Sequence, residues 1–155
     1  MARITITENE LRNLIGRSIE NALSRKMLRE EAEPGNNKIV DLISFLHNAQ
    51  LPVREIHWNT RNNALHLLTD EAIDELLDWE DRLAETYLGG NGGELKINGT
   101  SPTTTEFEGI MNDLIKWAND VRESIGDNKD FDNVNAIIDE ILETANKNLY
   151  RADFK

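Results

Sequence analysis

The sequence contains no cysteine and few basic residues, and each shortage excludes a class of protein. Without cysteine, neither disulfide bonds nor thiolate metal sites can form. Lysine and arginine number 17 against 29 acidic residues, for a formal net charge of −12. Such a charge disfavours binding to nucleic-acid phosphates as the main activity. No apolar run reaches the length of a membrane span, so we expect no membrane association.

The residues that are present predict a helical globular protein. Hydrophobic residues make up 39% and charged residues 30% of 155 positions, which is enough chain for one domain with a core. The apolar residues recur at helical spacing, which argues against disorder. The segment MARITITENE lacks the hydrophobic region of a signal peptide, and we therefore expect a cytoplasmic protein.

The spacing predicts an all-α fold of five helices, in which the first helix is an N-terminal extension, residues 1–35. This helix starts at a capping box of Thr7 with Glu10 and ends at the segment 34–37, Pro-Gly-Asn-Asn. The other four helices are predicted to form a four-helix bundle over residues 36–155.

The bundle helices are bounded by turn and capping signals. Pro52 should kink the second helix. The polar loop 89–105 has room for a short extended piece, and Thr103 with Glu106 forms a second predicted capping box after it. The four predicted helices are about Lys38 to Trp58, about Asn63 to Leu88, a helix between the threonine run 103–105 and Gly126, and a final helix that carries Val134 to Leu149.

Two of the three histidines lie in the segment HWNTRNNALHLLTDEAIDELLDWEDRLAE, residues 57–85. After His57, the four residues His66, Asp70, Asp81 and Glu85 follow the pattern H-x3-D-x10-D-x3-E. Imidazole nitrogen and carboxylate oxygen together suit a divalent transition metal, iron above all. The segment therefore predicts a metal site with these five residues as ligands.

The spacing of this pattern indicates that two chains build the site. On one helix all four residues project from one face, but 70 and 81 are roughly 16 Å apart and 66 and 85 roughly 28 Å. Both pairs share a midpoint between Glu75 and Leu76. A second copy of the helix that runs antiparallel about this midpoint places the first half of the pattern in one chain opposite the second half in the other. We therefore predict a two-fold interface around the apolar residues Ile73, Leu76 and Leu77.

The segment HWN followed by ALH-x3-D-x10-D-x3-E resembles the Dps proteins, the small ferritin-like miniferritins of prokaryotes. The segment DNVNAIIDEILETANKNLYRADF is also similar to their last bundle helix, and the resemblance covers roughly residues 38–155. It implies a ferritin-like four-helix bundle that assembles as a homo-dodecameric shell, encoded by a prokaryotic cell or a phage. It also implies a ferroxidase that oxidises Fe(II), typically with hydrogen peroxide, and stores Fe(III), which protects against oxidative stress.

In the family the ferroxidase centres lie between two-fold-related subunits. Carried over by position, the resemblance implies that one subunit supplies His57, His66 and Asp70, and that its partner supplies Asp81 and Glu85. The connection between the two histidines is shorter here than is usual in the family. Many family members coat DNA, but the net charge of −12 does not favour DNA binding here.

Several alternatives stay open at the level of sequence. The bundle could be a non-catalytic structural or interaction protein whose site binds Zn(II) or no metal. Trp58 could pack over the site or could be a core residue. His47 has no assigned role, and Trp79 and Trp117 are predicted to be packing residues.

Overall fold

A computed structural model describes residues 34–91 and 94–153, which belong to one compact unit, Pro34–Lys155. This part of the chain contains helices and no strand, which confirms the predicted all-α class. The predicted N-terminal helix lies outside the described residues. The elements are α2 (Pro34–Asn59), α3 (Asn63–Asn91), α4 (Phe107–Ile125), the 3-10 helix η1 (Lys129–Phe131) and α5 (Asp132–Ala152).

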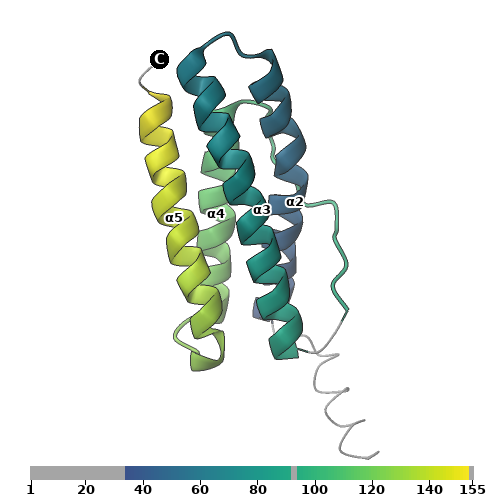
Figure 1. The fold of residues 1–155 in the computed structure, drawn as a ribbon. Coiled ribbons are helices and arrows are strands. Elements are labelled where there is room, and N and C mark those ends of the chain that lie inside the picture. The colour runs from purple at the N-terminus through teal and green to yellow at the C-terminus, as the bar shows by residue number, and fades with distance from the viewer. Residues whose placement is uncertain (1–33, 92–93, 154–155) are drawn as a thin grey trace, which may run out of the picture. The chain divides into compact units, whose positions relative to one another are not determined.

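The four α-helices form a bundle, as the sequence predicted (Figure 1). Helix α3 returns antiparallel to α2, and α5 returns antiparallel to α4. Between these hairpins, the long segment 94–106 runs back along the bundle, so α4 has the same direction as α3. Each hairpin packs on the other through α2 with α4 and through α3 with α5.

The core consists of apolar side chains from all four α-helices. Trp79 is 2% exposed, and the half-buried Trp117 packs against the core, which confirms a packing role for both. None of the helices in the described residues is long and apolar enough to cross a membrane. The largest fully buried side chains include Phe45, Phe107, Ile39, Leu42, Leu46, Leu76, Leu83, Ile110, Leu114 and Ile138.

The ends of the helices differ from the prediction in places. Helix α2 begins at Pro34, so the segment predicted to end an N-terminal helix forms the first turn of α2. Proline is favoured in a first turn because its missing N–H would have no helical partner there. Helix α2 continues through Pro52, and α3 extends past the two glycines to Asn91. The predicted break at Gly126 is confirmed, and its φ of 56° is one that glycine adopts readily.

The predicted capping box of Thr103 with Glu106 is wrong. Helix α4 starts at Phe107, and its N-cap residue Glu106 makes no capping hydrogen bond with its side chain. Thr103 instead donates from its N–H and its hydroxyl to Asp113, each at 2.7 Å. A bond to a carboxylate is stronger than a bond to a neutral group, which explains why Thr103 turns toward Asp113.

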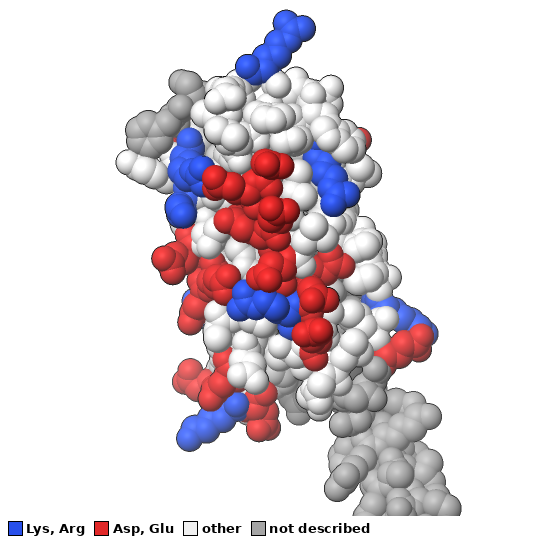
Figure 2. Space-filling model, in the orientation of Figure 1, with Lys and Arg blue, Asp and Glu red and all other residues white. Residues whose placement is uncertain are grey.

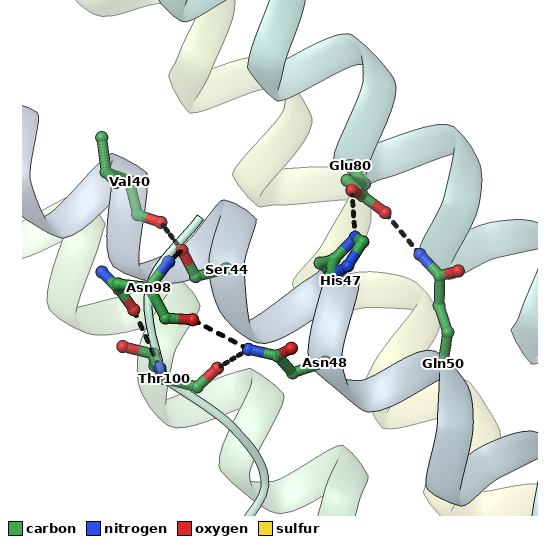
Figure 3. Close-up of polar contacts among 8 residues, drawn as sticks. All are labelled: Val40, Ser44, His47, Asn48, Gln50, Glu80, Asn98 and Thr100. Carbon is green, nitrogen blue, oxygen red and sulfur yellow. Dashed lines mark hydrogen bonds and ion pairs between the residues drawn. The ribbon is translucent and has the colours of Figure 1, made fainter. Parts of the chain in front are cut away.

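The segment 94–106 forms no helix or strand, and hydrogen bonds attach it to α2 (Figure 3). The buried hydroxyl of Ser44 accepts from the N–H of Asn98 at 3.0 Å. The side-chain amide of Asn48 donates to the carbonyls of Asn98 and Thr100 at 3.1 and 2.7 Å. These bonds give the long connection a defined path along α2.

Candidate metal centre

A three-residue turn joins α2 to α3 and brings two histidines together. The side chain of Asn62 accepts from the N–H groups of Ala64 and Leu65, at 2.9 and 3.2 Å, and so caps the start of α3. His57 lies in the last turn of α2 and His66 in the first turn of α3. Their rings stack with centroids 4.0 Å apart and an angle of 22° between the planes.

The hydrogen bonds of the two rings define their tautomers. His57 Nδ1 lies 3.1 Å from the carbonyl of His66, and His66 Nδ1 lies 3.0 Å from the carbonyl of His57. A carbonyl only accepts, so each Nδ1 must carry the proton. Each Nε2 of the neutral rings therefore keeps a free lone pair. Metal-binding histidines are commonly held in this way, with the second nitrogen bonded to an oxygen.

Two further residues complete the surroundings of His57. The buried hydroxyl of Thr69 lies 3.4 Å from its Nδ1 and donates to the carbonyl of Leu65. On the other side of the ring, Nε2 lies 4.0 Å from a carboxylate oxygen of Asp70. Two ligands held about 2.1 Å from one ion are at most about 4.2 Å apart. The distance thus allows both atoms to bind one metal ion.

Asp81 and Glu85 lie on the same continuous helix but far from this cluster. Helix α3 has no break between His66 and Glu85, so roughly 28 Å separates them along the axis. Among residues 34–91 and 94–153, no three histidine, aspartate or glutamate side chains are close enough to hold a metal ion. Within one chain, His57 thus lies beside His66 and within 4.0 Å of Asp70, but the three do not form a metal site, and Asp81 and Glu85 lie apart from them.

The acidic residues of α3 that face α5 have polar partners. Arg151 donates two hydrogen bonds to Glu71, which lower the pKa of that carboxyl. The Asn148 amide donates to Glu75 at 2.8 Å, but burial raises the Glu75 pKa. Figure 2 shows acidic side chains gathered in a band along the front of the bundle, where α3 lies.

Two carboxylates near the end of α3, Asp81 and Glu85, lack such partners among the described residues. Asp81 and Glu85 are exposed and form no hydrogen bond or ion pair with any other described residue. Their charges are therefore not neutralised by a neighbouring arginine or lysine in this part of the chain. Unneutralised carboxylates give a surface a negative potential, which attracts cations.

Large apolar side chains are exposed beside these polar groups. Leu51 and Trp58 on α2 are 60% and 68% exposed, and Leu77 on α3 is 41% exposed. The exposure of Trp58 excludes the core-packing interpretation of this residue. The predicted place of Leu76 in an interface is also wrong, because Leu76 is fully buried in the core of its own chain. It points about 100° away from Leu77 around the helix.

No role was predicted for His47 from the sequence, but the structure shows that its ring has a specific partner. Its Nδ1 lies 2.9 Å from an oxygen of Glu80, which connects α2 to α3. Leu51 and Trp58 follow His47 at helical spacing, which could have predicted that all three share one face of α2. The contact with Glu80 depends on how the two helices pack, and no sequence pattern indicates it.

Together, the fold and the site define a four-helix-bundle protein that carries histidines and carboxylates on the outer face of one hairpin. A family model matches residues 57–151, so the chain belongs to the family of unknown function DUF5856. The matched segment contains all five predicted metal ligands. No curated protein and no solved structure matches the chain.

Proposed function

We propose that the protein is a Dps-like ferroxidase, which binds and oxidises Fe(II) between two copies of the chain and stores or detoxifies the iron. One observation carries this proposal. One end of the outward face of α3 has His66 and Asp70 next to His57 of α2, and the other end has Asp81 and Glu85, which are unpaired among the described residues. Each end is an incomplete site, and the two ends complement each other.

The topology of the bundle supports this proposal. Ferritin-like bundles have one long crossover connection between two antiparallel hairpins. Segment 94–106 provides such a connection here, between α3 and α4. The bundle is therefore compatible with the ferritin-like class that the Dps resemblance implies.

The exposed apolar side chains support pairing with a second copy. A two-fold axis near Glu75 places Asp70 of one chain opposite Asp81 of the other. Between the two ends lie Leu77, which is exposed, and Ile73, which is half-buried. These residues and Leu51 form the proposed contact. On the Dps resemblance, six such pairs make a twelve-subunit shell.

The chemistry follows from the ligand types, with iron as the substrate. Neutral imidazoles and carboxylates bind Fe(II), and the negative carboxylates favour the more highly charged Fe(III) product. If hydrogen peroxide is the oxidant, two Fe(II) ions each give one electron, and the peroxide takes up two protons to form two waters. The acidic surface raises the local concentration of iron.

The first experiment measures Fe(II) oxidation under peroxide and under oxygen. Wild-type protein should oxidise Fe(II) faster than buffer, and the double variant Asp81→Ala/Glu85→Ala should lose that excess. The matched control is Glu123→Ala/Glu143→Ala, which removes the same charge from exposed positions on α4 and α5. An unchanged rate in the Asp81/Glu85 variant would contradict the proposal.

A mixing experiment tests whether two chains share the site. His66→Ala/Asp70→Ala and Asp81→Ala/Glu85→Ala should each be inactive alone. A mixed pair has one intact site, with His66 and Asp70 from one chain and Asp81 and Glu85 from the other. Co-refolding equal amounts should therefore restore about a quarter of the wild-type sites, since half the pairs are mixed and half their sites are intact. No recovery would indicate that the site is not shared.

The alternative is a non-catalytic bundle whose imidazoles and carboxylates bind Zn(II), since both ligand types suit zinc. It predicts tight Zn(II) binding without accelerated Fe(II) oxidation. Native mass spectrometry of the same samples separates a twelve-subunit shell from a dimer.

A further inference from the structure

His47 is held in a fixed position by a carboxylate from the neighbouring helix (Figure 3). Its Nδ1 lies 2.9 Å from Glu80 Oε1, and the side-chain amide of Gln50 donates to the other oxygen, Oε2. Both oxygens of Glu80 are thus engaged, and the side chain is only 20% exposed. The carboxylate lies between two residues of α2 that are one turn apart, which restricts its rotation.

This contact leaves the outer nitrogen of the ring available. An ionised carboxylate only accepts hydrogen bonds, so Nδ1 carries the proton and Nε2 of the neutral ring has a free lone pair. The side chain of His47 is 53% exposed. Carboxylate, histidine and metal in this order form a common arrangement in metal sites, because the carboxylate orients the ring and strengthens it as a ligand. All three histidines of the chain are therefore held in the same way, with Nδ1 bonded to an oxygen acceptor.

The position of His47 along the bundle differs from that of the other two histidines. His57 and His66 lie at the α2–α3 turn, whereas His47 contacts Glu80, the residue before Asp81. Because Glu80 precedes Asp81, this contact places His47 at the same level along α3 as Asp81. The two-fold pairing of the proposed function brings this part of α3 next to Asp70 and His66 of the other copy.

We propose that His47 is a further metal ligand at the shared site, contributed by the same subunit that supplies Asp81 and Glu85. Glu80 and Gln50 are positioning residues that act through His47. Each site then receives imidazoles from both copies: His57 and His66 from one and His47 from the other. This inference rests on the proposed function, because it requires the two-fold pair.

Binding of Co(II), used alone as a visible probe in place of Fe(II), tests the ligand role. His47→Gln should weaken Co(II) binding about tenfold or more and change the absorption spectrum of the bound ion. Glu80→Ala should weaken binding as well, and Glu80→Gln should recover part of the loss because its amide oxygen can still accept from Nδ1. Thermal unfolding of the metal-free variants should stay near wild type. The control Glu55→Gln changes an exposed α2 side chain and should bind like wild type.

The mixing experiment assigns His47 to one half of the site. As a third substitution in the His66→Ala/Asp70→Ala chain, His47→Gln should reduce the Co(II) binding of the mixed pair. As a third substitution in the Asp81→Ala/Glu85→Ala chain, His47→Gln should have no effect, because the His47 of that chain belongs to the inactive site. The reverse pattern, or an unchanged Co(II) spectrum in His47→Gln, would overturn the inference and leave the proposed function intact. Wild-type affinity for Co(II) in Asp81→Ala/Glu85→Ala would overturn both the role of His47 and the proposed function.

Discussion

The side of α3 that packs in the bundle and the side that faces outward differ in how they accommodate charged and apolar groups. Toward α5, Glu71 and Glu75 accept hydrogen bonds from Arg151 and Asn148. On the outward side, Asp81 and Glu85 have no such partner among the described residues, and Leu77 is exposed. The carboxylates Glu71 and Glu75 of the inner side have partners within one chain, whereas the outer side has groups that a second molecule could satisfy.

The same contrast holds between the two hairpins. In the α4–α5 hairpin, Tyr150 is the only exposed large hydrophobic side chain. The α2–α3 hairpin has five: Leu51, Trp58, Leu67, Leu77 and Leu88. Exposed apolar side chains gathered on one face are typical of interaction surfaces. In the proposed function, the α2–α3 face is the surface that contacts the second copy, and variants on the two sides of α3 test this difference.

The largest expected effect is on the free energy of unfolding, and it distinguishes two adjacent leucines of α3. Leu76→Ala should lower the free energy of unfolding by about 2–5 kcal/mol, because it leaves a cavity in the core. Leu77→Ala should cost the single chain only about 0.5 kcal/mol or less, because the side chain is partly exposed. Urea unfolding at one fixed chain concentration measures both. Equal losses would show that the outward side of α3 is as important for the fold as the core.

A charged side chain on the outward side should have a smaller effect on the stability of the fold and a large effect on self-association. Leu77→Asp, alone or with Leu51→Asp, should weaken self-association more than about tenfold, because a buried unpaired charge is costly at an interface. Helical content should remain at the wild-type level. Sedimentation velocity measures the mass, with Ile97→Asp as the control at an exposed position in the loop. An unchanged mass in the double variant would remove the α2–α3 face as the contact.

The smallest effect concerns pH. Burial raises the pKa of Glu75 above its usual 4.5, so the folded protein binds this proton more tightly than the unfolded chain does. The stability from this group is fully present below the usual pKa and is lost as pH rises through the raised one. Glu75→Gln should therefore be more stable than wild type at neutral pH, and its amide could donate to the buried, unpartnered Oδ1 of Asn148.

Urea unfolding at about pH 5.5 and about pH 8 measures the gain. Glu71→Gln is the matched comparison, one turn earlier on the same side. Hydrogen bonds from Arg151 lower the Glu71 pKa, so its contribution is present above the usual value and is lost as pH falls through the lowered one. The Glu71 variant should therefore be less stable at neutral pH, and a gain in stability there would contradict this account.

Much of the fold was predictable because it depends on local patterns. The apolar spacing indicated all four bundle helices, which the structure contains. The predictions were wrong where a contact with a residue distant in sequence outweighed the local pattern. Thr103 matches a capping pattern, but Asp113 takes its hydroxyl. Leu76 lies at the midpoint of a symmetric pattern, but the packing of the bundle turns it into the core.

For the candidate site, the sequence by itself determined which residues share the outward face of α3, because the 3.6-residue period of a helix needs no tertiary information. Only the tertiary structure decided how the histidines are held. The α2–α3 turn stacks His57 on His66, and the packing of α2 on α3 gives His47 its contact with Glu80. These contacts join residues on different helices, and their geometry depends on the register of two packed surfaces that no spacing within one helix encodes.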